Sequence, residues 1–484
     1  MTTLVRTIAL AAAALAAPAS RGQDLTVKAP PQSRPVLITN VAVYPVSGPP
    51  IASGKVLFID GVIRHVGGMA EPITMVEAVV PETIDGKGKR LYPGLIAPAT
   101  TIGLVEISSV RATRDFAEVG GVTPEVRAAV AVNPDSWHFP VARMTGVLTA
   151  CVFPDGGAIP GRASVVRMDG WTWESMAVLD DAGLVVDWPA VRPIRAWWMD
   201  RSDEEQQKEI RKALDRIEQA FASAEAYLRA RAADASTPTS IRLEAMRPAL
   251  EGKRPVFVRC QDLEQIQSAV TWGAKRGLRM VIVGGRDALL CADLLKKHDV
   301  GVIVSGTHRL PRRADAAYDE PFTLPAELEK AGIRWALATP GATSQGNDRN
   351  LPYQAATAVA FGLENAAALR GVTLGAAQLL GVSDTLGSIE PGKAATIFLA
   401  DGDPLEITTR IEAAWIDGRA IDLSNKQTAL AAKYREKYRQ LGLINGSQAL
   451  RNDARQGDKP AKADAPAPAH APGEPAAAPS SLNR

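Results

Sequence analysis

The feature that most constrains the fold of this chain is an alternation of apolar, β-branched segments with amphipathic ones across residues 91–387. The apolar segments are typical of strands buried on both faces of a parallel sheet. The amphipathic segments, such as residues 263–277, have helical periodicity. At this length, the alternation predicts a (β/α)8 TIM-like barrel. The predicted strands lie at residues 146–153, 254–260, 279–285, 300–306 and 333–339.

Two β-rich segments flank this region, at residues 36–90 and 388–423. Each contains an Asp-Gly pair between two apolar runs, Asp60-Gly61 in the first and Asp417-Gly418 in the second. Such a pair favours a two-residue hairpin with positive φ. We expect the two segments to pack together as one small β-sandwich built from both ends of the chain.

A long helix is predicted from residue 202 onward. Ser202 and Glu205 form a capping-box pattern, which marks a helix start. Apolar residues then recur every three or four positions, which places them on one helix face. They are Ile210, Leu214, Ile217, Phe221, Ala224 and Leu228. This face is expected to pack on the barrel, and partner binding is the alternative.

The two ends of the chain read as non-barrel segments. Residues 1–22 have the pattern of a signal peptide, with an apolar core at 7–19 that ends in Ala-Pro-Ala. This predicts a periplasmic or secreted protein, with a cytosolic protein that has an Ala-rich start as the alternative. Residues 424–450 are predicted to be helical, and the Ala/Pro-rich residues 451–484 to be disordered.

Composition excludes several classes of partner. The chain has 55 basic and 53 acidic residues, a balance that gives no basis for binding nucleic acid. No later apolar run is long enough to cross a membrane. The three cysteines, Cys151, Cys260 and Cys291, are widely spaced and form neither a disulfide framework nor a metal knuckle. They are expected to be small buried hydrophobic residues.

Four stretches together resemble the amidohydrolase superfamily, in particular its imidazolonepropionase-like branch. They are "GKVLFIDGVIRHVGG" (54–68), "IDGKGKRLYPGLI" (84–96), "GGRDALLCADLLKKHDVGVIV" (284–304) and the stretch from "NLPYQAATAVAFG" to "FLADGDPLE" (350–406). In that order, they look like the family's opening sandwich strands, its entry into barrel strand 1, its strand 6 to strand 7 region, and its last barrel helix with the return to the sandwich.

The resemblance implies hydrolysis of C–N bonds by a zinc-like metal at the C-terminal end of the barrel. The family's ligands are an H-x-H pair after strand 1, a His after strand 5, a His near strand 6 and an Asp after strand 8. The matching positions here are Ala99 and Thr101, Arg259, residues 284–286 and Pro340. The resemblance therefore predicts that this chain lacks the metal ligands and uses no metal cofactor.

Other residues are candidates for the vacated site. Candidates for acid–base chemistry are Glu106, Asp262 and His308, which follows the seventh predicted strand. Arg259 and Arg286, with more basic residues at 308–313, are candidates for binding an anion. Alternatively, Arg259 pairs internally with a carboxylate such as Asp262 or Glu106. The other histidines, His65, His138, His298 and His470, are expected to be structural.

These observations favour one interpretation and leave two alternatives. The favoured one is a catalytically lapsed superfamily member that acts as a structural or regulatory subunit, beside an intact paralogue or as a homo-oligomer. The first alternative is an active hydrolase of non-peptide or dipeptide C–N bonds. The second is a periplasmic protein that binds an anionic small molecule.

Overall fold

The computed structural model describes residues 24, 26–73, 80–195, 199–340 and 345–444. The chain divides into two compact units, residues 1–427 and 428–484. The predicted signal peptide and the predicted disordered tail lie outside the described residues, as does His470.

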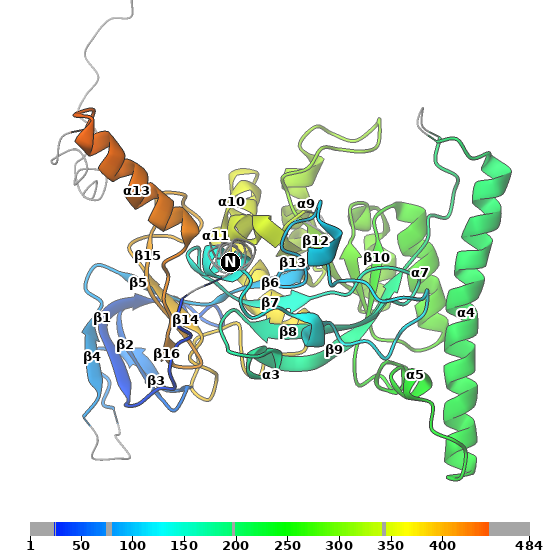
Figure 1. The fold of residues 1–484 in the computed structure, drawn as a ribbon, viewed down its shortest axis with the longest axis horizontal. Coiled ribbons are helices and arrows are strands. Elements are labelled where there is room, and N and C mark those ends of the chain that lie inside the picture. The colour runs from blue at the N-terminus through cyan, green and yellow to red at the C-terminus, as the bar shows by residue number, and fades with distance from the viewer. Residues whose placement is uncertain (1–23, 25, 74–79, 196–198, 341–344, 445–484) are drawn as a thin grey trace, which may run out of the picture. The chain divides into compact units, whose positions relative to one another are not determined.

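The centre of the first unit is an eight-stranded sheet that nearly closes into a barrel (Figure 1). Its strands pair in sequence order, and β13 also contacts β6, which brings the two edges of the sheet together. The predicted α/β barrel is therefore confirmed. The strands are β6 (Leu95–Thr100), β7 (Val147–Val152), β8 (Gly161–Arg167), β9 (Ala177–Asp187), β10 (Val256–Cys260), β11 (Met280–Gly284), β12 (Gly301–Ser305) and β13 (Trp335–Ala338).

One strand corrects the prediction of a parallel sheet. β8 runs antiparallel to both β7 and β9, whereas the other neighbouring strands pair in parallel. The reason is the length of the connection, because only residues 153–160 join β7 to β8. A parallel crossover needs a dozen residues or more, so this short loop returns the chain as an antiparallel neighbour.

Helices cover the outer face of the barrel. Val256, Val258 and Ile282 point outward into the cluster shared with these helices, whereas Phe257 and Val281 belong to the interior cluster. This is the period-2 alternation of a strand with both faces buried. The larger elements are α2 (His138–Arg143), α7 (Leu263–Lys275), α8 (Ala292–Lys297), α9 (Glu320–Lys330), η4 (Gln345–Asn350), α10 (Leu351–Ala360), α11 (Asn365–Gly371) and α12 (Leu374–Leu380). Shorter ones are η1 (Arg111–Thr113), η2 (Ala128–Ala131), α3 (Trp173–Met176), α5 (Ile241–Glu244), α6 (Arg247–Leu250) and η3 (Ala288–Cys291).

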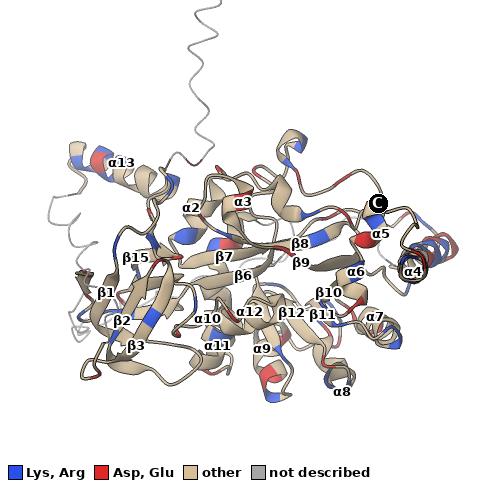
Figure 2. Ribbon diagram, turned by 90° about the horizontal axis from the view of Figure 1, so that it is seen from below, with Lys and Arg blue, Asp and Glu red and all other residues tan. Residues whose placement is uncertain are grey.

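The long helix α4 (Asp203–Ala233) begins as predicted. Ser202 and Glu205 cap its N-terminus reciprocally. Its stripe packs against the barrel layer, with Phe221 in edge-to-face contact with Trp272 at 4.7 Å between ring centroids. The predicted packing of this helix face is thus confirmed. The remaining surface of α4 carries charged side chains of both signs (Figure 2).

A second sheet combines strands from both ends of the described chain, which lie side by side in Figure 1. The junction is the antiparallel pair of β5 and β14. The predicted β-rich second part is confirmed, as one continuous sheet with its own apolar cluster. Its strands are β1 (Val36–Val43), β2 (Ile51–Ile59), β3 (Val62–Gly68), β4 (Glu82–Asp85), β5 (Arg90–Pro93), β14 (Ile397–Ala400), β15 (Ile411–Ile416) and β16 (Arg419–Ala420).

Both Asp-Gly hairpins form. Asp60 and Gly61 have φ of 49° and 78°, and Asp417 and Gly418 have φ of 48° and 72°. Positive φ at both central residues is the signature of a type I′ turn. The two turns also touch, since a Cβ on Gly418 would lie 2.9 Å from the Cα of Gly61. The hairpins therefore join segments that are more than 300 residues apart in sequence.

A buried ion-pair cluster holds the first described residue to the barrel unit. Arg143 donates to Asp169 at 2.8 Å and lies 3.5 Å from Asp24. Lys28 pairs with Asp24, and Arg419 pairs with Asp169. The side chain of Arg143 is 1% exposed, so its charge is compensated almost wholly by these carboxylates.

The predicted C-terminal helix is present as α13 (Lys426–Gln440), and none of its residues is buried. In the described parts of the chain, no helix has both the length and the apolarity of a membrane span.

Candidate functional site

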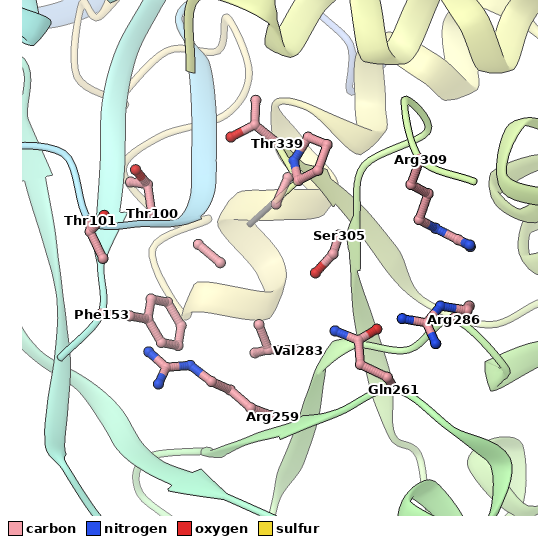
Figure 3. A pocket seen from close by; sticks show the side chains of 13 residues that line it. Thr100, Thr101, Phe153, Arg259, Gln261, Val283, Arg286, Ser305, Arg309 and Thr339 are labelled. Atoms are coloured by element: carbon pink, nitrogen blue, oxygen red, sulfur yellow. The ribbon is translucent and has the colours of Figure 1, made fainter. Parts of the chain in front are cut away.

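A cavity of about 280 Å³ lies at the C-terminal ends of the barrel strands (Figure 3). Strand periodicity determines which residues reach it. On β10, Phe257 points inward, so Arg259 two residues later points the same way at the strand end. On the neighbouring strands, Val283 of β11 and Ser305 of β12 also point inward and line the cavity. This is the face where barrel enzymes place their active sites.

The lining divides by chemistry. Its charged and amide side chains are Arg259, Arg286, Arg309 and Gln261, and its hydroxyls belong to Thr100, Thr101, Ser305 and Thr339. The apolar lining consists of Ala99, Phe153, Val283, Ala338 and Pro340. Figure 3 shows Arg286, Arg309 and Gln261 on one side, and Phe153, Thr100 and Thr101 on the other.

Arg259 pairs internally, with partners other than those expected. Its Nη1 donates to Asp187 at 3.0 Å and to Asp155 at 3.2 Å, and Nη2 donates to the carbonyl of Pro154. The expected partners were Asp262 or Glu106. The difference arises because Asp187 ends β9, the immediate neighbour of β10, and occupies the position paired with Arg259.

Burial raises the pKa of Asp187, and the nearby Asp155 adds to this effect, while Arg259 opposes it. The guanidinium of Arg259 therefore holds two carboxylates that would otherwise repel each other.

Arg286 and Arg309 come from the loops after β11 and β12. Nη1 of Arg286 donates to Asp262 at 3.0 Å, and Arg309 forms a forked pair with Glu320 at 2.9 and 3.0 Å. Burial holds the pKa of Arg286 below its usual range; Asp262 opposes this shift, and the positive charges of Arg309 and Arg312 add to it. Asp262 and Glu320 do not line the cavity.

A buried carboxylate lies behind the threonines of the cavity. Thr100 donates to Asp348 at 2.5 Å, and Thr339 donates to the other oxygen of the same carboxylate at 2.7 Å. Burial raises the pKa of Asp348 to about 6, against the opposing effect of these two hydrogen bonds. Sequence reasoning did not single out Asp348, which lies in η4, eight residues beyond Pro340. The only signal was an acidic residue in the loop after the last strand.

The three acid–base candidates lie outside the cavity lining. Glu106 accepts a hydrogen bond from Asn133, and burial raises its pKa. Asp262 caps α7 and pairs with Arg286. The His308 ring contacts Thr357 at 2.8 Å. The structure therefore brings Arg259 and Arg286 together at one cavity but does not place these three residues in it.

The other histidines and the cysteines also lie outside the lining. His65 is in β3, His138 begins α2 and His298 ends α8. All three cysteines are free and buried, as expected.

The side chains around the cavity do not fit a divalent metal. Zinc-like ions bind imidazole, thiolate or carboxylate groups. The described lining residues supply guanidinium, amide and hydroxyl groups instead. Within the described ranges, which omit residues 341–344, no three His, Cys, Asp or Glu side chains are grouped as a metal site. Guanidinium groups are permanently charged and would repel a cation.

Comparisons with known proteins agree with this barrel. The model of the amidohydrolase family matches residues 274–429. Amidohydrolase tasK of Hapsidospora irregularis is 24% identical over 409 residues, which are 76% of this chain and 40% of that protein. The imidazolonepropionase of Sphingopyxis alaskensis is 42% identical over 88 residues, which are 17% of this chain and 21% of that protein. The chain thus spans less than half the length of either relative.

The architecture matches more completely. The crystal structure of an amidohydrolase from Thermotoga maritima superimposes with a TM-score of 0.68 at 25% identity, over 80% of this chain and 99% of that one. The superposition thus spans almost the whole of that structure. The family match, the sequence relatives and this architecture relate the chain to the amidohydrolase superfamily.

Proposed function

We propose that this protein is a member of the superfamily that has lost metal-dependent hydrolysis and serves as a structural or regulatory subunit. The observation that carries the proposal is Arg259. Its guanidinium reaches the cavity from the end of β10, where the resemblance places a metal-binding His. A permanently charged group held by Asp187 and Asp155 takes the place of a neutral ligand.

The state of the scaffold supports the same conclusion. The strand pattern, the paired Asp-Gly turns and the cavity are all retained. Neutral drift towards a protein that does not fold would damage these features together with the site. Their retention favours selection for the folded surface, as expected for a subunit that contacts a partner. We further propose export, on the pattern of residues 1–22, and a homologue with intact ligands or a second copy as the partner.

Metal content and activity test the loss of catalysis. The mature protein, purified without chelators, is expected to contain far less than one equivalent of zinc, manganese, iron or nickel by elemental analysis. It is also expected to leave dipeptides, lactams and cyclic ureides intact. A metal-binding superfamily enzyme purified in the same buffer is the control. One metal per chain together with hydrolysis of any of these substrates would contradict the proposal.

Association tests the subunit role. The protein isolated from its native source under mild conditions is expected to elute from a sizing column above the mass of its 51.3 kDa chain. Mass spectrometry of that peak should identify a homologue or this chain alone. Recovery as a stable monomer with no associated homologue would count against a structural or regulatory subunit.

A further inference from the structure

The cavity has a polar wall and an apolar wall. The polar wall consists of Arg286, Arg309 and Gln261 (Figure 3). The apolar wall includes Phe153 and Ala338, and the guanidinium of Arg259 lies on this side, 5.7 Å from the ring centroid of Phe153. Such sites combine a mainly apolar lining with a few polar groups that fix the orientation of a ligand. A ligand that suits both walls has a polar or charged end and a short apolar body.

The polar wall presents positive charge to the cavity. The guanidiniums of Arg259, Arg286 and Arg309 line the cavity, whereas their partners Asp187, Asp262 and Glu320 do not. Arginine is suited to binding carboxylates because its planar fork of N–H groups matches the two carboxylate oxygens. The wall therefore favours an anionic end over a neutral or cationic one.

Arg286 has the most unused hydrogen-bonding capacity. The structure gives its guanidinium one hydrogen bond, from Nη1 to Asp262. Its Nε is buried and has no acceptor among the described residues. By contrast, Arg309 uses both Nη atoms on Glu320, and Arg259 uses both on Asp155, Asp187 and Pro154. Among the residues that the structure describes, none therefore accepts a hydrogen bond from the Nε–Nη2 edge of Arg286.

A glycine makes room for this arrangement. Gly284 ends β11 with φ of +117°, and a Cβ there would lie 2.3 Å from Nε2 of Gln261. The amide of Gln261 therefore lies over the end of β11, where the resemblance places another metal ligand. A side chain at 284 would displace Gln261 from the cavity.

We propose that the cavity binds a small monocarboxylate with an apolar body. The carboxylate accepts hydrogen bonds from Arg286, with Gln261 as a neighbouring donor, and the apolar body packs against Phe153 and Ala338. The inference deepens the proposed function and rests on it, since a regulatory subunit without the metal uses the old catalytic cavity to sense a ligand.

The surrounding charges favour a monoanion. The three guanidiniums are paired with four carboxylates, namely Asp155, Asp187, Asp262 and Glu320. A dianion would bring two further negative charges close to these four carboxylates. A monocarboxylate can accept hydrogen bonds from the Nε–Nη2 edge of Arg286 while bringing only one negative charge.

Hexanoate, its neutral analogue hexanamide and inorganic phosphate are suitable probes for calorimetric titration of the mature protein. Hexanoate is expected to bind. Hexanamide should bind at least about tenfold more weakly, because a charge-assisted hydrogen bond is worth about that factor. Phosphate should also bind more weakly, because it carries more negative charge and has no apolar body to pack against Phe153 and Ala338. This comparison uses the unaltered protein and remains informative even if a variant fails to fold. Equal binding of hexanoate and hexanamide, stronger binding of phosphate, or no binding of hexanoate would overturn the inference.

Two variants then locate the site. Arg286→Gln is expected to weaken hexanoate binding by about tenfold or more. Arg334→Gln removes a guanidinium that pairs with Asp299 outside the cavity, and its hexanoate affinity should equal that of the parent. Unchanged affinity in a folded Arg286→Gln variant would refute the assignment. Metal content separates the two proposals: stoichiometric metal with hydrolysis contradicts the loss of catalysis, whereas a metal-free protein that ignores hexanoate contradicts only the ligand.

Discussion

The hydroxyl of Thr100 donates to the carboxylate of Asp348 at 2.5 Å, linking the end of the first barrel strand to η4. Asp348 is 1% exposed, so this contact and the one from Thr339 replace hydration of the carboxylate. Burial dominates, and the pKa of Asp348 is raised to about 6 from 3.8.

The first prediction concerns the pH dependence that this carboxylate imposes on stability. Because its pKa is higher in the folded state, its contribution is most favourable below pH 3.8 and is lost as the pH rises through about 6. The loss amounts to roughly 3 kcal/mol of unfolding free energy. Asp348→Asn does not titrate. The stability of the parent relative to this variant is therefore expected to fall between pH 4.5 and pH 7.

Urea unfolding of both proteins at the two pH values measures this difference. Other carboxylates titrate equally in parent and variant, so their effects cancel in the comparison. A constant difference in unfolding free energy between pH 4.5 and pH 7 would show that Asp348 titrates normally.

The second prediction is that Arg259 stabilises the fold at neutral pH. Arg259→Met leaves Asp187 and Asp155 without their shared cation, at an expected cost of about 1–3 kcal/mol at pH 7. Burial already raises the pKa of Asp187, and loss of Arg259 raises it further. The cost should therefore shrink as the pH falls and Asp187 takes up a proton.

Adding Asp187→Asn to Arg259→Met should restore part of the lost stability, because it removes one of the two uncompensated charges. Thermal unfolding at pH 4.5 and pH 7 gives the comparison. The ion-pair explanation is wrong if Arg259→Met loses the same stability at both pH values and the second substitution restores none.

Features that depend on neighbouring residues in the sequence could be predicted, whereas features that depend on the tertiary fold could not. Arg259 follows an apolar run with a clear strand pattern, and its inward direction follows from period 2 once that strand is recognised. Asp187 ends an 11-residue strand whose apolar run, Leu184 to Val186, is short and follows "LDDAG". Its pairing with Arg259 depends on strand order, which is a tertiary property.

Asp348 illustrates the same limit from a loop. The family resemblance directs attention to Pro340, directly after the last barrel strand. The carboxylate that contacts the end of β6 instead comes from η4, and only the folded path of the intervening loop brings it there. Hairpins are the opposite case, because Asp60-Gly61 and Asp417-Gly418 encode their turn geometry within two residues.

The third prediction concerns the buried ion-pair cluster. Arg143→Met leaves Asp24 and Asp169 with one fewer compensating cation in surroundings that exclude water. Loss of one member of a buried pair costs roughly 3–5 kcal/mol. Arg334→Met is the control, because Arg334 and Asp299 form an exposed pair whose loss should cost at most about 1 kcal/mol. Equal losses of urea-unfolding free energy in the two variants would contradict the role assigned to burial.

The fourth prediction tests whether contact between the two hairpins contributes to stability. Gly418→Ala would place a Cβ 2.9 Å from the Cα of Gly61, at a residue whose φ of +72° already disfavours side chains. We expect a cost of about 2–4 kcal/mol, which combines backbone strain with overpacking. Gly392→Ala is a matched control, since its φ is +93° and no atom lies within 4 Å of the added Cβ. It should cost only the strain, about 1–2 kcal/mol.

Urea unfolding of the two variants gives the cost of crowding at Gly418 as the difference between them, and this crowding includes Oε1 of Gln32 at 2.4 Å as well as Gly61. Gly61→Ala supplies a test from the other side, because its Cβ would lie 2.8 Å from the carbonyl oxygen of Asp417. If the hairpins support each other, Gly61→Ala and Gly418→Ala should be less than additive in the double variant, since either one alone already separates the turns. Full additivity, or a Gly418→Ala cost equal to that of Gly392→Ala, would mean that the turns merely lie near each other.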